Sequence, residues 1–242
     1  VALLRTRRAE EGARLFDDPR VTIVSLDPRT ALSLLDRRFD LIHLADTEGM
    51  PAASAGLVSL EEDYLLTTQA ISMALGRLRT GGLITATRGL QSPPRDTLRL
   101  VSLYARAARG TGGDPATRIA LARNYLAATT ILARDSLRPT EIRRLVARAG
   151  ELVMDVDYVP GISPADLTEL NRIAGPPGAQ GSYLYHGARE LVGDSPQGFI
   201  DRWLYRIDPP TDNWPYFHNF FRLSSLNTFI DSYGHLWFSR LE

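Results

Sequence analysis

Cysteine and lysine are both absent from this sequence of 242 residues, and all 28 basic side chains are arginine. Without cysteine the chain has no disulfide bond, no thiolate metal ligand and no cysteine nucleophile, which fits a reducing compartment. Without lysine it has neither a Schiff-base amine nor a phosphate-loop lysine. We attribute the arginine bias to genome composition. The two absences therefore exclude several common kinds of catalytic site.

Other features are equally scarce. The formal net charge is zero, which argues against a general electrostatic grip on nucleic acid. The four histidines are scattered without metal-ligand spacing, so we expect no metal site. We expect no signal peptide, and the sequence has no Gly-x-Ser-x-Gly elbow and no apolar run near the ~20 residues that span a bilayer. The hydrophobic fraction of 44% is that of an ordinary soluble domain.

The stretch from Ser59 to Arg95 carries the clearest pattern. Ser59 and Glu62 form a capping box, which predicts a helix that begins at Ser59. Apolar residues recur at helical spacing up to Leu78, and Gly81 supplies the left-handed conformation that ends a helix. Residues 83–87 follow as a short β-rich run. A helix that feeds into a hydrophobic strand is half of a βαβ crossover, so the pattern predicts an α/β fold.

The rest of the chain alternates in the same way. Helices are predicted over residues 3–16, 29–35, 96–109, 139–150 and 196–204, and an amphipathic helix over 223–240. Strands are predicted over 21–26, 39–44, 118–122, 127–133 and 152–156, the third and fourth as an antiparallel pair. The apolar run 39–44 suggests a strand buried on both faces, with His43 buried and hydrogen-bonded. Residues 45–58 follow it as a loop at a strand's carboxyl end, where α/β sheets bind ligands.

Proline and glycine become dense after Pro160, which marks a mobile loop or a boundary. We therefore expect two parts, an α/β domain over 1–160 and an extension over 161–242 that packs on it. The irregular run 208–221 is rich in aromatics, and large aromatics in such a loop are usually core. We predict that five aromatic residues pack the extension onto the sheet: Trp214, Tyr216, Phe217, Phe220 and Phe221.

The motifs DPRVTIVSLDPRTAL, FDLIHL, ASAGLVSLEEDYLLTTQAI, LRTGGLITATR, SPPRDTLRL and PPTDNWPYF occur in this order. Together they resemble the polyamine aminopropyltransferase (spermidine synthase) superfamily, most closely a bacterial branch attached to membrane-spanning helices. The resemblance covers about residues 15–221. It implies the Rossmann-like, class I methyltransferase-type fold, a mostly parallel sheet flanked by helices. It also implies S-adenosylmethionine or decarboxylated S-adenosylmethionine as the ligand.

By the same resemblance this chain begins at the helix before the third strand of that sheet, without the first two strands. A Gly-rich turn that lets backbone approach the ligand is absent before Val21. The resemblance implies a domain on the cytoplasmic side of the inner membrane, attached through membrane helices outside this chain. Its expected partners are a small-molecule amine or none, and no nucleic acid. The final amphipathic helix suggests either a membrane-interface contact or a homodimer contact.

The resemblance also implies site residues. Asp27 corresponds to the acid that contacts the adenine amino group, although it is equally suited to cap the helix that follows. The family's proton-accepting Asp aligns with Ala45, one residue before Asp46. An aminopropyl transfer needs a carboxylate to deprotonate the amine. Asp46 is therefore the catalytic candidate, Glu48 is a substrate-binding candidate, and polyamine synthesis by this chain is not favoured.

Three further residues are candidates at the same edge. Arg88 is assigned to cofactor binding and Arg95 to substrate binding, because both flank the Pro-Pro loop after a strand and can grip a carboxylate or phosphate. A surface ion pair with Asp96 or with an acid of the loop is the alternative for both arginines. Tyr64, after an acidic run, is assigned to the substrate, with core packing as its alternative.

The sequence predicts a spermidine synthase-like domain of a larger membrane-associated protein, an aminopropyl- or methyltransferase that is inactive as this segment alone. The alternative is a non-catalytic binding or scaffolding module that retains the fold, which the alanine at position 45 favours. Methyl transfer to a small acceptor is supported only by fold analogy.

Overall fold

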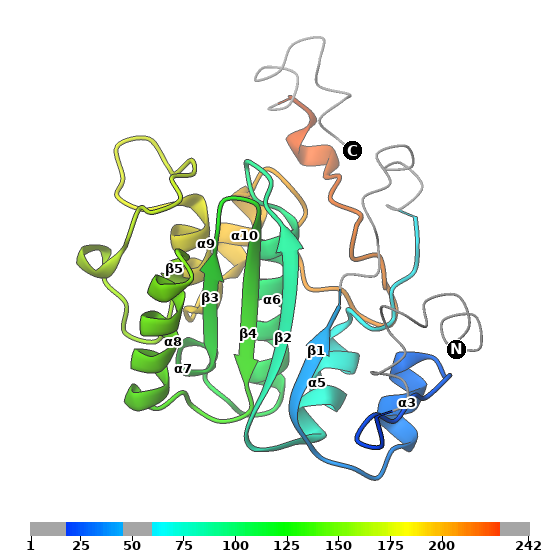
Figure 1. Cartoon of the computed structure of the whole chain (residues 1–242). Helices are drawn as coiled ribbons and strands as arrows, with labels where there is room; N and C mark the ends of the chain where they lie inside the picture. The colour runs from blue at the N-terminus through cyan, green and yellow to red at the C-terminus, as the bar shows by residue number, and fades with distance from the viewer. Residues whose placement is uncertain (1–17, 46–59, 228–242) are drawn as a thin grey trace, which may run out of the picture. The chain divides into compact units, whose positions relative to one another are not determined.

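A computed structural model of the chain describes residues 18–45 and 60–227 (Figure 1). The chain divides into two compact units, Val1–Asp36 and Arg37–Glu242. The described part of the first unit holds one helix, α3 (Pro28–Leu34), which Asp27 caps by accepting a hydrogen bond from the Thr30 amide at 2.9 Å. Proline at the first helical position fixes its start. The helix predicted over 29–35 is confirmed, and the one over 3–16 lies outside the described residues.

The strand predicted over 21–26 is wrong. The segment has no regular secondary structure, and Ile23, Val24 and Leu26 are exposed. Its β-prone residues favour an extended chain, but a strand exists only where a neighbour bonds to its backbone. Within the described residues no strand pairs with this segment.

The second unit contains a five-stranded sheet in the order β1-β2-β4-β3-β5 (Figure 1). Its strands are β1 (Phe39–Leu44), β2 (Leu78–Gly89), β3 (Ile119–Arg123), β4 (Ala127–Ala133) and β5 (Asp155–Tyr158). Strands β1 and β2 are parallel and are joined through helix α5 (Thr68–Gly76), which confirms the βαβ crossover. The fold is therefore α/β, with helices flanking the sheet.

The sheet is mixed, and the prediction that it is mostly parallel is wrong. Strand β4 pairs antiparallel with both β2 and β3, and β5 pairs antiparallel with β3. The cause lies in the connections. Only residues 124–126 join β3 to β4, and so short a link forms a hairpin, whereas a parallel pair needs a crossover of a dozen or more residues. The predicted antiparallel pair of these two strands is confirmed.

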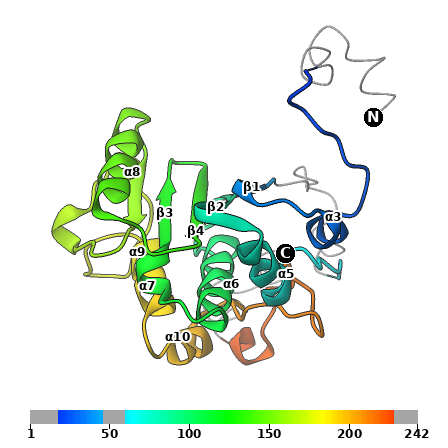
Figure 2. The ribbon, with the colours of Figure 1, turned by 90° about the horizontal axis from the view of Figure 1, so that it is seen from below.

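Helices cover the two faces of the sheet unequally (Figure 2). Besides α3 and α5, the described helices are α6 (Asp96–Gly110), α7 (Pro115–Arg118), α8 (Pro139–Glu151), α9 (Tyr183–Val192) and α10 (Gln197–Arg202). Two short 3-10 helices, η1 (Pro164–Asp166) and η2 (Leu223–Ser225), are also present. Helices α5, α6 and α9 lie on one face and α8 on the other (Figure 2). In the described parts of the chain, no helix combines the length and apolar character needed to cross a bilayer.

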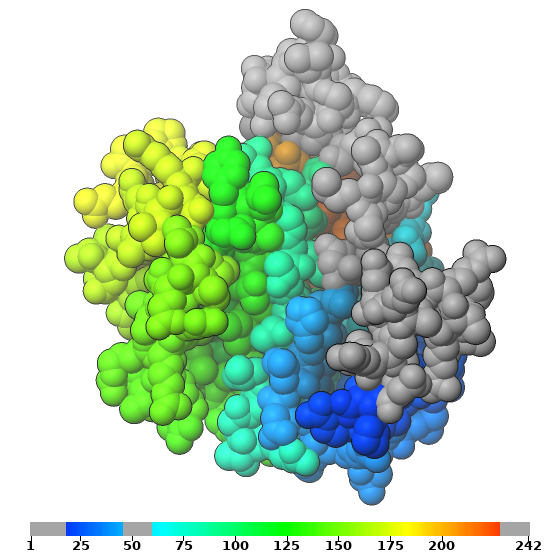
Figure 3. Space-filling view, in the orientation of Figure 1, coloured from blue at the N-terminus to red at the C-terminus, as the bar shows by residue number. Residues whose placement is uncertain are grey.

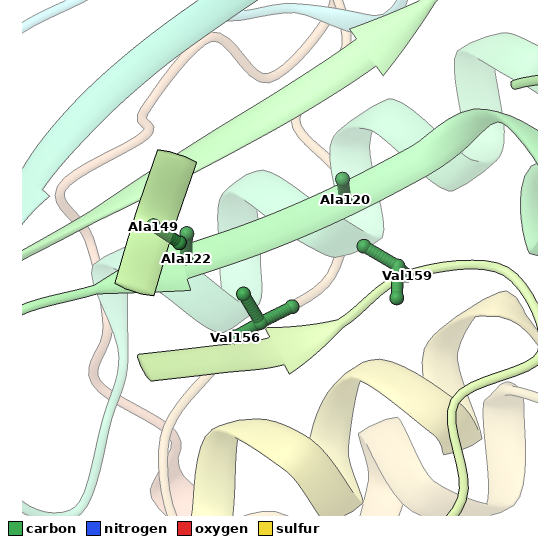
Figure 4. Close-up of a cluster of buried hydrophobic side chains, with 5 residues drawn as sticks. All are labelled: Ala120, Ala122, Ala149, Val156 and Val159. Atoms are coloured by element: carbon green, nitrogen blue, oxygen red, sulfur yellow. The ribbon is translucent and has the colours of Figure 1, made fainter. Parts of the chain in front are cut away.

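Small side chains let α8 approach the sheet closely. Ala120 and Ala122 of β3 pack with Ala149 of α8 and with Val156 and Val159 on and after β5 (Figure 4). Alanine at these positions leaves room for the helix backbone near the strand. This cluster fixes α8 over the β5 side of the sheet.

The rest of that face is open within the described residues. Along β2, Ile84, Ala86 and Arg88 are buried towards α5 and α6, while the alternate residues are half-buried. Strand β1 buries only one face, so the prediction of burial on both faces is wrong. His43 lies on the exposed face and contacts the Thr85 hydroxyl at 3.0 Å, so it is hydrogen-bonded but not buried. A hollow of about 430 Å³ separates α8 from β2 and β4 on the face shown in Figure 3.

The helix of the crossover begins later than predicted. It starts at Thr68, and the side chain of Thr67 caps it by accepting from the Ala70 amide at 3.2 Å. The preceding residues turn instead, because Asp63 accepts hydrogen bonds from the Leu65 and Leu66 amides. Gly81 does have positive φ, but it lies in a bulge within β2, where the register with β1 shifts. Ser59 lies outside the described residues.

Helix α9 was not predicted, because the density of proline and glycine around it masked its pattern. Ser182 caps it by accepting from the Tyr185 amide, and Leu184, Ala188 and Leu191 are buried at helical spacing. It packs on α6 and β5. The division predicted at residue 160 stays a prediction, as does most of the helix over 223–240, which lies outside the described residues.

The irregular segment 208–221 is held by Arg99, a fully buried residue of α6. Arg99 Nε donates to the Asp208 carbonyl at 3.1 Å, and Nη1 donates to the carbonyls of Phe217 and Asn219 at 2.7 and 2.8 Å. Its guanidinium carbon lies 5.1 Å from the centroid of the Trp214 ring. Burial lowers the pKa of Arg99 to about 9, so the side chain is still a cation at neutral pH.

The predicted packing of the aromatics is confirmed in part. Phe217 and Phe220 are buried, and Trp214 and Tyr216 are half-buried. Phe221 is 38% exposed, so its assignment to the core is wrong. Arg99 accounts for the arrangement, since its guanidinium also lies within 5.5 Å of the Phe220 ring centroid.

Replacing Arg99 by methionine is expected to lower the free energy of unfolding by roughly 3 kcal/mol, because three buried carbonyl groups lose a charged donor. Arg99→Lys should recover little of this loss, since an ammonium lacks the guanidinium fork. Urea unfolding followed by tryptophan fluorescence measures both. The matched control is Arg106→Gln, an exposed position on the same helix, which should change stability by less than about 0.5 kcal/mol. An Arg99→Met protein as stable as this control would refute the role of Arg99.

Candidate functional site

The carboxyl ends of β1, β2 and β3 lie at one edge of the sheet. β1 is parallel to β2, and β3 has the same direction as β2 because both are antiparallel to β4. In open α/β sheets this edge binds ligands. Arg88 and Arg123 stand at the ends of β2 and β3, and the side chains of both are almost fully buried.

Arg88 is 7% exposed and faces the side of the sheet that α6 covers. Its Nη1 donates to the carbonyl of Thr87 at 3.0 Å, and its Nε makes no hydrogen bond within the described residues. No carboxylate of the described part lies within ion-pair distance of it. A buried guanidinium with a donor left over is costly unless a ligand or water satisfies it.

Asp96 is a buried acid on which the charge of Arg88 acts. It begins α6, is 9% exposed, and accepts a hydrogen bond from Gln91 Nε2 at 2.7 Å through Oδ2. Its Oδ1 has no hydrogen-bond partner among the described residues. Burial raises the pKa of this carboxyl, against the Gln91 hydrogen bond and the charges of Arg95, Arg88 and Arg99.

Two further groups face Arg88. Tyr104 of α6 is fully buried, its hydroxyl has no hydrogen-bond partner in the described part, and burial raises its pKa while Arg88 opposes the shift. Burial also raises the pKa of Asp63, which the Leu65 and Leu66 amides and Arg88 oppose. The charge of Arg88 thus acts on two acids of raised pKa and on a phenol. We call Asp63, Arg88, Asp96 and Tyr104 the β2-edge cluster.

A cavity of about 420 Å³ opens beside this cluster. It is bounded by the 90–94 loop, the turn at Tyr125 and Leu126, and residues 172–174. Gln91 lines the cavity and bonds to Asp96, so it connects the cavity to the cluster. Its size suits a ligand of small-molecule dimensions.

The cluster has the components of a polar ligand site. A carboxyl group with raised pKa and an oxygen without a partner can give or take a proton, or accept from an amine or hydroxyl. Arg88 can donate to an anionic group through Nε. Water could satisfy the same atoms, but that would still leave a carboxyl and a guanidinium buried without an ion pair.

The structure separates the predicted site residues. Arg88 and Arg95 both act on the charge of Asp96, so these two are brought to one place. Asp27 caps α3 in the first unit, which bears out the capping alternative for it. Asp46 and Glu48 lie outside the described residues. No surface ion pair joins Arg88 to Asp96 in the described part, since both are buried.

Tyr64 and Arg95 have contacts that the sequence did not indicate. Tyr64 is 44% exposed, so its alternative assignment to the core is wrong, and a hydrogen bond with Glu62 raises its pKa. The guanidinium of Arg95 lies 5.4 Å from the Tyr205 ring centroid and 5.2 Å from that of Phe220. Its position there is set by cation–π contacts with the C-terminal segment.

Sequence reasoning missed Asp96, Tyr104 and Asp63. Asp96 was considered only as a surface partner of the arginines, and Tyr104 as part of an apolar helix. A polar residue in a helix buried on all sides is the signal that was available, and nearly all of α6 from Asp96 to Ala108 is buried. Among the described residues, no group of His, Asp or Glu side chains is placed to hold a metal ion.

Replacing Asp96 by asparagine is expected to stabilise the protein at neutral pH. A raised carboxyl pKa in the folded state means that the folded chain holds its proton longer than the unfolded chain, so Asp96 costs stability as the pH rises above the unfolded value of about 3.9. The gain from Asp96→Asn should therefore be near zero below about pH 4 and grow towards pH 7. Urea unfolding across this range measures it, with the exposed Asp40→Asn as control. A gain independent of pH would contradict the buried charge.

Comparison with known proteins adds no assignment to this geometry. No protein-family model matches the chain, and no curated protein matches its sequence. The family named by resemblance is therefore a hypothesis, and the function is argued from the β2-edge cluster and its cavity.

Proposed function

We propose that this chain is a spermidine synthase-like domain that binds S-adenosylmethionine, or its decarboxylated form, at the carboxyl edge of β1 and β2. The observation that carries the proposal is the parallel β1-α5-β2 crossover with the buried Arg88 and Asp96 at its ligand-binding edge. The cavity beside Gln91 supplies room for the nucleotide. The parent protein, by the resemblance, is attached to membrane helices on the cytoplasmic side.

In this proposal Arg88 holds the carboxylate of S-adenosylmethionine, a contact that the decarboxylated form lacks, and Asp96 accepts from the ammonium group of either ligand. Asp46, which lies two residues after the end of β1 in the sequence, takes the proton of the attacking amine. The amine nitrogen attacks a carbon bonded to the sulfonium, the carbon–sulfur bond breaks, and its electron pair stays on sulfur. Attack on the aminopropyl carbon of the decarboxylated form releases methylthioadenosine, and attack on the methyl carbon of S-adenosylmethionine releases S-adenosylhomocysteine.

Arg88→Gln is expected to weaken the binding of S-adenosylmethionine at least tenfold, because a charged hydrogen bond to a carboxylate is lost. Isothermal titration calorimetry with S-adenosylmethionine, S-adenosylhomocysteine and methylthioadenosine measures the change. Methylthioadenosine has no carboxylate, so its affinity should be almost the same for both proteins. The control is Arg79→Gln on the same strand, whose side chain is 58% exposed and paired with Asp40.

Two results would contradict this assignment. If none of the three nucleosides binds the unaltered protein, the adenosyl ligand is wrong. If Arg88→Gln weakens methylthioadenosine as much as S-adenosylmethionine, Arg88 does not act on the carboxylate.

A second candidate function is a binding or scaffolding module without catalysis. Alanine at position 45 favours it, because alanine stands where the resemblance requires the proton-accepting acid. The module would retain the sheet and its ligand edge, and would bind without transferring a group.

Asp46→Ala in the full-length protein distinguishes the two functions. If the chain is a transferase, losing the general base should lower product formation about 100-fold or more while nucleoside binding persists. Product measured by mass spectrometry in cells that carry the variant is the readout, with Asp40→Ala as the exposed control. An unchanged yield would remove the best catalytic carboxylate and favour the binding module.

A further inference from the structure

A second cavity lies at the carboxyl end of β3, away from the β2-edge cluster. Its volume is about 130 Å³, and the residues that matter here are Arg123, Asp157, Glu169, Arg172, Gly181 and Ser182. At roughly 10–15 Å³ per water it has room for several waters or one small molecule, and it is below the usual size for a drug-like ligand.

Its inner wall carries buried charges of both signs. The side chains of Arg123, Asp155 and Asp157 are 4%, 2% and 4% exposed. Arg123 Nη1 lies 3.3 Å from Asp155, and Arg123 Nε lies 2.8 Å from Asp157. The net formal charge of the three groups is one negative, which a protein interior tolerates only with a further compensating group.

Asp155 is committed to the fold. Thr168 Oγ1 and the amides of Leu170 and Asn171 donate to it at 2.6, 2.8 and 2.7 Å. Although burial opposes it, these hydrogen bonds and Arg123 lower the pKa of Asp155. Asp155 is therefore the permanent counter-ion of Arg123, and it holds the 168–171 segment in place.

Asp157 and Arg123 keep bonding capacity. Ser182 Oγ donates to Asp157 Oδ1 at 2.5 Å, and Oδ2 lies 2.8 Å from Arg123 Nε. Burial raises the pKa of Asp157, against the effect of Arg123. Arg123 donates to the Asn171 carbonyl through Nη1, and its Nη2 donates to no acceptor of the described part. Asp157 Oδ2 is thus in an ion pair with Arg123 Nε, and Arg123 Nη2 makes no hydrogen bond within the described residues.

The outer wall of the cavity also carries one acid and one arginine. Glu169 and Arg172 are exposed and line the same cavity. The N-terminus of α9 forms another wall through Gly181 and Ser182, and its partial positive charge favours an anionic group. The loop is closed tightly here, because a side chain at Gly175 would collide with the Gly181 carbonyl.

We propose that this cavity binds a small α-amino acid. The ligand carboxylate lies towards Arg123 Nη2, Arg172 and the α9 N-terminus, and its ammonium group lies towards Asp157 and Glu169. A dipolar ligand satisfies both signs of charge, whereas a lone anion would face Asp157 and Glu169, and a lone cation would face the two arginines. The cavity adjoins the proposed nucleoside cavity, with which it shares Arg172 and Ile173 as lining residues, but it does not include the β2-edge cluster.

The test titrates the unaltered protein with alanine, acetate and methylammonium. Binding is measured by NMR from the amide shifts of Gly175, Gly181 and Ser182, and from competition between the three probes. Alanine should bind at least tenfold more tightly than either single-charge probe. Arg172→Gln and Glu169→Gln should each weaken alanine at least fivefold. Because both positions are exposed, these variants should fold, which urea unfolding checks. Arg88→Gln is the control and should leave alanine binding unchanged.

Several outcomes would overturn the proposal. Acetate binding as tightly as alanine would make the cavity an anion site, and methylammonium doing so would make it a cation site. The absence of alanine binding at about 10 mM would also overturn it, because this concentration is tenfold above the upper end of the usual range of enzyme KM values. Loss of alanine binding in Arg88→Gln would place the amino acid at the β2 edge instead. Failure of alanine to bind this cavity leaves the S-adenosylmethionine titrations with Arg88→Gln unaffected, so the two proposals fail separately.

Discussion

The second unit depends on a guanidinium buried without a carboxylate bonded to it. Arg99 donates hydrogen bonds to the carbonyls of Asp208, Phe217 and Asn219. These carbonyls lie in an irregular segment, whose own backbone does not supply donors for them. Aromatic faces around it replace part of the lost hydration. The segment that Arg99 anchors in turn fixes the start of α5, because Thr67 Oγ1 donates to Asp212 Oδ1 at 2.7 Å. One side chain of α6 thereby links the C-terminal segment to the crossover helix.

Buried arginine recurs through the carboxyl edge of the sheet. Arg88, Arg99 and Arg123 are all under 9% exposed, and each meets a different environment. Arg99 donates to three carbonyl groups through Nε and Nη1, Arg123 is paired with two aspartates, and Arg88 has no ion-pair partner in the described part. The guanidinium suits such sites, since it is weakly hydrated and offers five donors in a fixed fork. The difference among the three separates a structural role from two candidate ligand sites.

Local sequence predicted the elements that rest on strong local patterns. Helix α8 begins at Pro139 and α6 spans 96–110, as expected from capping and periodicity. The βαβ crossover and the hairpin of β3 and β4 were likewise predicted. Predictions failed where a distant contact competed with a local signal. The capping box with Glu62 predicted a helix start before Tyr64, but the helix is capped by Thr67 instead. Thr67 is held there by a hydrogen bond to Asp212, which is far away in the sequence, so Tyr64 lies outside the helix.

The sequence by itself determined the α/β class, the order of most elements, and the absence of cysteine and lysine chemistry. Periodicity, capping and turn residues act between neighbours, so they are legible in one chain. Only the tertiary structure decided that the sheet is mixed and that Asp96 and Asp157 are buried acids. It also decided which carbonyl or carboxylate groups each buried arginine contacts. These properties depend on the dielectric and on partners brought from remote segments, and no local pattern encodes them.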